Sequence, residues 1–283
     1  MRFLRNPLAA VMALTAFAAG PGAGQAGEHD KVVLQPHRAV YDMALISVGS
    51  SANLASISGR MVFEFTGSAC EGYTVNSRFV TRLDDAEGNR RVTDLRLSTY
   101  ETHDPDVLQF LNQTYTNESL EEEVKGTAER LPDGLKVRLV APVEREQVLP
   151  GNPLFPTAHI IALVGAAKAG ETFFNVDLYD GSETGLSVYA TNAVIGPRRD
   201  GLGEPGYDAE AALAPLREAE SHWPIALSYF DTTDDRADVT PKYELRFFMY
   251  DNGVSRNLTL DYGSFVLSGS LTELEYLDTP TCD

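Results

Sequence analysis

The stretch ISGRMVFEFT-GSACE-GYTVNSRFVTRL begins at Ile57 and ends at Leu83, and it contains two strand-like segments joined by a turn. The turn, Gly67–Glu71, is rich in small and polar residues. In the segment after it, Val75, Phe79 and other apolar residues are interleaved with polar ones. A period near two is typical of a strand that buries one face. The stretch therefore predicts a pair of neighbouring strands in a larger sheet.

The same pattern recurs along most of the chain, and its clearest example is a hairpin near the C-terminus. Tyr243–Tyr250 and Val254–Tyr262 flank the turn Asp251-Asn252-Gly253. Asn-Gly supplies the positive φ angles that a tight hairpin turn requires. We expect one mainly β domain over residues 37–283. Its other strands are predicted at His37–Val48, Arg90–Glu101, Val107–Thr116, Glu118–Arg130, Leu135–Val140, Phe173–Tyr179, Gly185–Ile195 and Ser264–Leu277.

One segment has a helical pattern. Thr157–Ala169 (TAHIIALVGAAKA) follows Pro156, which favours a helix start, and precedes Gly170, which favours a stop. Its apolar residues surround most of the circumference, which predicts a helix buried on more than one side. In contrast, Arg198–Glu220 is rich in Gly, Ala, Pro and charge, and we expect a long surface excursion or a disordered loop there.

The N-terminus has the pattern of a secretory signal peptide, predicted at residues 1–26. Arg2 and Arg5 are followed by an apolar run, Leu8–Ala19, and then by small residues that end at Ala26. The apolar run is too short to span a bilayer, which needs roughly 20 residues. We therefore expect export to the periplasm, no transmembrane anchor, and a flexible segment at residues 27–36.

The chain carries a formal net charge of −18. A surface this acidic repels phosphate groups, so nucleic acid and anionic lipid headgroups are not expected partners. The simplest role for the charge is solubility.

Two cysteines, Cys70 and Cys282, lie 212 positions apart. In an oxidising compartment they are expected to pair, and the alternative is two buried free thiols. A loop this long corresponds to about 5 kcal/mol in the chain-entropy model, as an upper figure. A redox-catalytic role is disfavoured because the chain has no Cys-x-x-Cys.

No residue pattern predicts a catalytic, cofactor or metal site, so we expect a non-enzyme. No two of the histidines have metal-ligand spacing, and a lone helical histidine is usually structural. A turn explains Asp180-Gly181-Ser182-Glu183 better than a hydrolase elbow does. Solvated positions explain the remaining acidic groups better than calcium binding does. The residues considered are His29, His37, His103, His159, His222, Asp180–Glu183, Asp231, Asp234, Asp235 and Glu121–Glu123.

The chain resembles the EipB-like family of periplasmic cell-envelope integrity proteins. The resemblance rests on HRAVYDMAL at His37–Leu45, on Ser58–Arg82, on FPTAH at Phe155–His159, and on DGSE at Asp180–Glu183. It implies an antiparallel sheet of about fourteen strands rolled into an open spiral, larger than most open sheets. It also implies a Cys70–Cys282 disulfide and a functional link to a periplasmic tetratricopeptide-repeat protein.

Three functions remain open from the sequence. The favoured one is a non-catalytic periplasmic factor that supports envelope integrity through protein partners. The second is a lipid or lipopeptide binder that uses the concave face of a lipoprotein-carrier-like half-barrel. The third is a cell-wall hydrolase, in which Ser182 or His159 would be essential.

Overall fold

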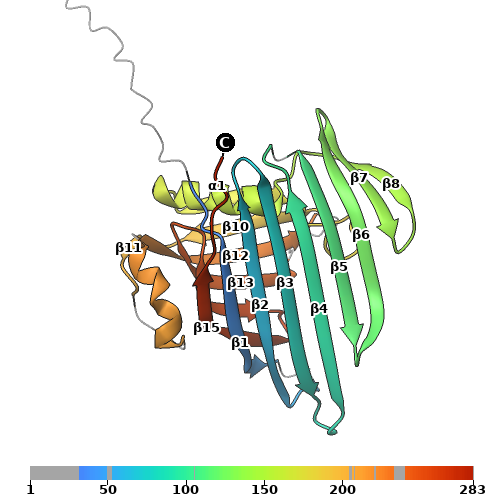
Figure 1. Ribbon diagram of the computed structural model, residues 1–283. Helices are drawn as coiled ribbons and strands as arrows, with labels where there is room; N and C mark the ends of the chain where they lie inside the picture. The colour runs from blue at the N-terminus through green and yellow to red at the C-terminus, as the bar shows by residue number, and fades with distance from the viewer. Residues whose placement is uncertain are drawn as a thin grey trace, which may run out of the picture. The chain divides into compact units, whose positions relative to one another are not determined.

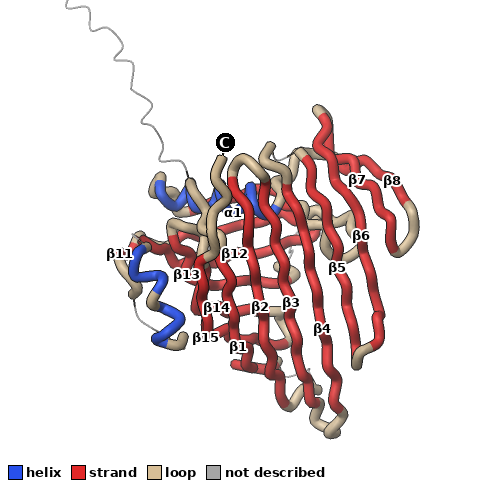
Figure 2. Tube along the Cα trace, viewed as in Figure 1, coloured by secondary structure: helices blue, strands red, loops and turns tan. Residues whose placement is uncertain are grey.

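Fifteen strands form one sheet that rolls up without closing (Figures 1 and 2). The computed structural model describes residues 32–49, 53–104, 106–203, 206, 208–219, 221–232 and 240–282. The expected signal peptide lies outside these residues, as do His29, Asp234 and Asp235. Residues Val32–Asp283 form one compact unit. The mainly β, open-spiral prediction is confirmed.

The strands are long in the first half of the chain and shorter in the second. The first eight are β1 (His37–Val48), β2 (Ser56–Ser68), β3 (Gly72–Asp84), β4 (Arg90–Glu101), β5 (Val107–Thr116), β6 (Ser119–Leu131), β7 (Gly134–Ala141) and β8 (Arg145–Leu149). After the helix come β9 (Phe173–Leu178), β10 (Tyr189–Ile195), β11 (Arg199–Asp200), β12 (Ser221–Asp231), β13 (Tyr243–Tyr250), β14 (Ser255–Asp261) and β15 (Phe265–Tyr276).

Strand order follows chain order except at one join. The path runs from β8 back to β1, continues through β15, β14, β13 and β12, and ends at β10 and β9, while β11 pairs with β12 alone. All named strand pairs are antiparallel. Pairing of β1 with β15 places His37 opposite Tyr276, so the first and last strands lie side by side. β8 and β9 are the two edge strands of the sheet, and they do not pair with each other.

Buried apolar side chains lie mainly on the inner face of the sheet, and charged side chains lie mainly on the outer face. On β1, Ala39, Tyr41 and Met43 are buried on the inner face. On the outer face, ion pairs cross the strands: Arg60 contacts Asp42 at 2.8 Å, and the Arg78–Asp94 distance is also 2.8 Å. This partition follows from the period of two in the sequence.

Helix α1 (Pro156–Lys168) lies inside the roll across one of its ends (Figure 1). Leu163 and Val164 pack into a cluster with residues of β10, β12 and β13. Ile160 and Ile161 contact a second cluster, which contains Phe65 of β2 and Val75 of β3. The helix therefore joins the two layers of the roll, and the prediction of a buried helix at 157–169 is confirmed.

Most described residues of Arg198–Glu220 are exposed, as expected of a surface excursion, but the alternative of a disordered loop is wrong for them. This segment contains β11 and two short 3-10 helices, η1 (Glu210–Leu213) and η2 (Pro215–Glu218). Ala212, Leu213 and Leu216 are buried in a cluster that also contains Leu271 of β15. Three apolar residues in so short a segment are too few to produce a periodic hydrophobic pattern in the sequence. Their burial nevertheless holds the segment against the sheet.

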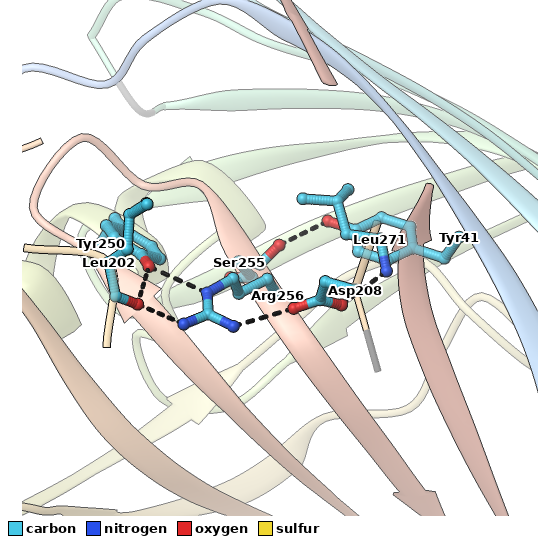
Figure 3. A network of polar contacts seen from close by, with 7 residues as sticks. All are labelled: Tyr41, Leu202, Asp208, Tyr250, Ser255, Arg256 and Leu271. Atoms are coloured by element: carbon cyan, nitrogen blue, oxygen red, sulfur yellow. Dashed lines mark hydrogen bonds and ion pairs between the residues drawn. The ribbon is translucent and has the colours of Figure 1, made fainter. Parts of the chain in front are cut away.

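A buried ion pair fixes this excursion to the sheet (Figure 3). Arg256 of β14 contacts Asp208 at 2.9 Å, and both side chains are fully buried. The Arg256 guanidinium also donates to the Tyr250 hydroxyl and to the Leu202 carbonyl. The other Asp208 oxygen accepts the backbone N–H of Leu271 at 2.7 Å.

Three strands escaped the sequence analysis: β8, β11 and β12. Trp223, Ile225 and Leu227 of β12 are buried, but Pro224 argued against a strand in the middle of a sheet. In the structure Pro224 lies one residue beyond the last β10–β12 pair, Ile195 with Ile225. Its missing N–H therefore breaks no pair with β10.

Residues 32–36, the end of the expected flexible segment, contact the domain directly. Leu34 is buried, and the Gln35 N–H donates to the Asn252 carbonyl at 2.9 Å. The Gln35 amide donates to the carbonyl of Leu277, whose own N–H donates to the Pro36 carbonyl. These contacts tie this segment to the C-terminal tail.

Candidate functional site

The concave inner face of the rolled sheet is the candidate site, because only part of it is filled. Helix α1 fills one part, and the loop between β9 and β10 fills another. The remainder keeps contact with solvent.

The filled part next to α1 is built around Glu101 of β4. The Glu101 carboxylate accepts the backbone N–H groups of Thr157 and Ala158 at 2.8 and 3.0 Å. These are free donors of the first helical turn, and Phe155 at the N-cap supplies no side-chain bond to them. Burial raises the pKa of Glu101, while the bonds from the helix oppose that rise. Glu101 therefore anchors the start of the helix to β4.

The loop between β9 and β10, residues 179–188, crosses to the inner face of β5–β7. The Asn112 amide of β5 donates to the Gly181 carbonyl at 2.7 Å. Gly181 has a positive φ of 71°, and a Cβ there would lie 2.5 Å from the Phe110 ring. Only glycine permits both the conformation and this close approach. The loop thus connects the two layers without strand hydrogen bonds.

A cluster of tyrosines extends from this loop across β10, β12 and β13. The rings of Tyr229 and Tyr243 stack with centroids 4.3 Å apart, and Tyr189 contacts both edge-on. Tyr262 continues the row, with its ring centroid 6.3 Å from that of Tyr243. Burial raises the pKa of Tyr189, Tyr229 and Tyr243, so all are neutral hydroxyl groups at neutral pH.

Asp180 lies at the loop end of the tyrosine cluster. Burial raises its pKa, although the N–H of Ser182 donates to its carboxylate at 2.9 Å and opposes the rise. Its side chain keeps partial contact with solvent. Asp180 is therefore a desolvated carboxyl group held by the backbone of its own loop.

Six inner-face residues of β3, β4 and β5 form what we call the open inner wall. Strand register places them on the same face as the core residues Val75 and Phe110. Five of the six are half-buried, and Leu95 is 40% exposed, in contrast to Val75 at 9% and Phe110 at 3%. The wall consists of Ser77, Thr81, Thr93, Leu95, Asn112 and Thr114.

His159 and Ser182, the residues considered for a hydrolase, have separate hydrogen-bond partners. His159 lies 3.1 Å from the Thr191 hydroxyl, which itself donates to the Val176 carbonyl. The His159 ring must therefore donate through Nε2. Burial lowers the pKa of His159 to about 4. The Ser182 hydroxyl donates to the Tyr189 hydroxyl at 3.3 Å.

The acidic candidates do not assemble into a metal site within the described residues. Lys242 forms ion pairs with both Asp231 and Glu183, which neutralises this corner of the sheet. Glu121 is exposed at the start of β6, and Glu123 accepts a bond from Gln113.

The other described histidines that the sequence analysis considered also make packing or ion-pair contacts and form no site. His37 packs against Phe63 and Phe65, and exposed His103 contacts Asp104 at 3.0 Å. His222 is fully buried and stacks on Tyr250 with ring centroids 5.0 Å apart.

Cys70 and Cys282 form a disulfide that links the β2–β3 turn to the C-terminal tail. Their Cα atoms are 5.8 Å apart. The pairing expected from the compartment and from the family resemblance is present in the structure.

A shallow depression of about 310 Å³ lies on the outer face across β2–β5. Its arginines, Arg78 and Arg96, both pair with Asp94. Glu64 also lines the depression, so the two arginines are balanced by two carboxylates.

Comparison with known proteins defines the family. The EipB-like family model matches residues 28–278. The chain belongs to the EipB-like family. The cell envelope integrity protein EipB of Brucella abortus (strain 2308) is 40% identical over 280 residues, covering 99% of this chain and 97% of that protein.

A solved structure from Brucella abortus shares the fold. The crystal structure of a beta-barrel-like protein of a domain of unknown function from Brucella abortus has a TM-score of 0.79 and 38% identity to this chain. The match covers 87% of this chain and 100% of that one. Among the residues described here, none of the helices has the length and apolar character needed to cross a membrane.

The sequence analysis missed the open inner wall and the tyrosine cluster. The alternation in β3 and β4 does place Ser77, Thr81 and Thr93 on one face. Which part of that face α1 and the 179–188 loop leave uncovered depends on contacts between distant segments, such as Asn112 with Gly181.

Proposed function

We propose that this protein is a non-catalytic periplasmic factor that supports the integrity of the cell envelope through protein partners. The observation that carries the proposal is the 40% identity to the Brucella abortus cell envelope integrity protein over 99% of this chain. Identity at this level over whole chains, together with a shared fold, favours a shared role. A periplasmic tetratricopeptide-repeat protein, the partner implied by the family resemblance, belongs to the same proposal.

A disulfide supports the periplasmic location. The Cys70–Cys282 bond closes a long loop and would persist only in an oxidising compartment. The signal-peptide pattern at residues 1–26 would deliver the chain there.

The hydrogen bonding of the polar candidates supports a non-catalytic role. A serine hydrolase needs its nucleophile within hydrogen-bond reach of a base. Here the Ser182 hydroxyl bonds to Tyr189, while His159 bonds to Thr191 and has a pKa of about 4. His159 is too weak a base at that pKa to accept a proton near neutral pH.

Complementation of a deletion strain tests this proposal. Cells lacking the protein should lose viability under envelope stress, such as detergent, and wild-type protein should restore it. Ser182→Ala should restore viability equally, because the account assigns no chemistry to this hydroxyl. Loss of complementation by a Ser182→Ala protein with unchanged abundance and melting temperature would instead favour the hydrolase.

Ligand binding on the concave face is the second candidate, and the partly exposed open inner wall favours it. A lipid or lipopeptide is the ligand expected from the carrier-like architecture. Replacing Thr93 with Trp would fill the wall without touching the outer face. Loss of complementation by this variant while it stays folded would place the activity on the concave face, and full complementation would place it on the outer surface.

A further inference from the structure

We propose that the open inner wall and the tyrosines that continue the concave face bind a neutral saccharide chain. This inference rests on the concave-face candidate above, but it assigns that face a saccharide in place of a lipid. It does not depend on the outcome of the deletion experiment.

Contacts between residues form a circuit around the wall. It starts at the Asn112–Gly181 hydrogen bond and continues from Ser182 to Tyr189, and from there to Tyr243. The ring of Tyr243 contacts that of Tyr262.

The circuit then returns to the wall through the opposite side. The ring of Tyr262 lies 5.0 Å from that of Phe265, and Phe265 packs into the same cluster as Phe79. Phe79 is paired with Leu95 across β3 and β4, and Leu95 is paired with Thr114 of β5. Leu95 is 40% exposed and Tyr262 is 38% exposed, so two residues of this circuit are accessible to solvent.

The wall presents hydrogen-bonding groups without charge. Four of its six residues carry hydroxyl groups, and Asn112 carries an amide. On the same three strands, the outer face carries Arg78, Asp94 and Arg96. Among the inner-face positions of β3, β4 and β5, all of them described, two are charged: Glu101, which α1 covers, and Arg91, which is exposed near the start of β4. Hydroxyl and amide groups can both donate and accept, as sugar hydroxyls do.

The tyrosines supply the second element of a sugar site. A tyrosine ring presents a large apolar face and a hydroxyl at its edge, which matches the mixed C–H and O–H surface of a pyranose. Tyr243 is half-buried, and Tyr262 is exposed beyond it. Lys242 approaches the same cluster at 5.8 Å from the Tyr189 ring, but Glu183 and Asp231 neutralise it.

A simple acyl chain fits this wall poorly. It would exclude water from Ser77, Thr81, Thr93 and Thr114 without giving their hydroxyl groups a partner. An unpaired buried hydroxyl costs about 1–3 kcal/mol, so four such groups would offset much of the apolar gain. Anionic headgroups are also disfavoured, because none of the six wall residues is a cation and the Asp180 carboxylate lies next to the tyrosines; Arg91, the cation on this face of β4, lies toward the start of that strand.

Matched valine substitutions test the inference. Thr81→Val and Thr93→Val remove wall hydroxyls at nearly constant shape, and Thr74→Val changes a half-buried outer-face residue on the same strand as Thr81. Titration calorimetry of the purified, oxidised protein would use chitohexaose, cellohexaose and maltohexaose as saccharide probes, and dodecanoate as the acyl probe. Melting temperatures would establish that every variant is folded.

The inference predicts that wild-type protein binds at least one hexasaccharide. The double variant Thr81→Val/Thr93→Val should bind it roughly tenfold more weakly, because lost hydroxyl partners reduce affinity for a hydroxyl-rich ligand, and Thr74→Val should bind as wild type. Three outcomes would overturn the inference. They are no saccharide binding at millimolar concentration, saccharide binding unaffected by the double variant, or binding of dodecanoate alone.

Survival of the deletion strain is a separate readout. A double variant that loses saccharide binding yet restores viability would leave the saccharide site standing and show that envelope support does not need it. A deletion strain with no envelope defect would overturn the proposed function without affecting the binding result.

Discussion

The carboxylate of Glu101, on β4, accepts the backbone N–H of Thr157, the second residue of α1, at 2.8 Å across 56 positions of sequence. A strand residue thereby performs the role that an N-cap side chain usually has. The same carboxylate also binds the N–H of Ala158. This relationship places the helix at one end of the roll and so determines which half of the concave face remains open.

Replacing Glu101 with Ala should destabilise the protein by about 1–3 kcal/mol, because two buried N–H groups lose their acceptor. For a chain of this size the melting temperature should fall by roughly 2–4 °C per kcal/mol. Glu101→Gln keeps one carbonyl acceptor and should lose less. Scanning calorimetry of the two variants checks this, and an unchanged melting temperature for Glu101→Ala would contradict the anchoring role.

Cys70→Ser should lower the melting temperature and raise protease sensitivity without abolishing export. The loss should be at most about 5 kcal/mol, the chain-entropy figure for a loop of this length. Reduction of wild-type protein with dithiothreitol should give the same shift, and Cys70→Ser/Cys282→Ser should add little to either single change. Equal stability of oxidised and reduced protein would rule out a stabilising disulfide.

Asp208→Leu should destabilise the protein by about 3–5 kcal/mol, because it removes the Asp208 carboxylate that contacts the fully buried Arg256 guanidinium. The double variant Asp208→Leu/Arg256→Met removes both charges and should recover part of that loss. Chemical denaturation of the wild type, both single variants and the double variant measures the coupling. Additive single effects would mean that the ion pair does not hold the excursion.

Buried His159 should make stability depend on pH. Its pKa of about 4 lies below the ordinary value of 6.5, so between these values the unfolded chain binds a proton that the folded chain does not. Stability should therefore fall as the pH drops from about 6.5 to 4, by up to about 3 kcal/mol.

His159→Gln is the control for this effect, since it cannot titrate in that window. Denaturation midpoints at several pH values should show a flatter profile for the variant than for the wild type. Parallel profiles would assign the acid sensitivity to other groups, such as His37, whose pKa burial also lowers.

Local patterns predicted most of the fold. Period-two alternation located β1–β7 and β13–β15, and Pro156 and Gly170 marked the ends of α1 to within two residues. Such features depend on the backbone of a short segment and are therefore visible in the sequence. β12 was not predicted, and it contains Pro224, which contradicts the local rule for strands. Pro224 lies opposite Phe248 of β13, but its carbonyl accepts the Gly196 N–H on the other side, so the missing N–H faces away from β13 and lies just past the end of β10.

The site could not be predicted in the same way. Asp180–Glu183 was recognised as a turn, but its contact with Asn112 of β5 joins residues 69 positions apart. Similarly, the sequence analysis placed Asp208 in a surface or disordered segment and did not predict its ion pair with Arg256. Long-range pairs of this kind leave no periodic trace in a single sequence, whereas the cysteine pair was predictable because only two cysteines exist.

The most direct test of the account compares two versions of the protein in a strain that lacks it: the full chain and a chain without residues 2–26. Plating efficiency under detergent stress is the measurement. The account predicts that only the full chain restores growth, because the protein acts in the periplasm, although both chains are present in equal amounts. Equal rescue by the shortened chain, or normal growth of the deletion strain, would contradict a periplasmic role in envelope integrity.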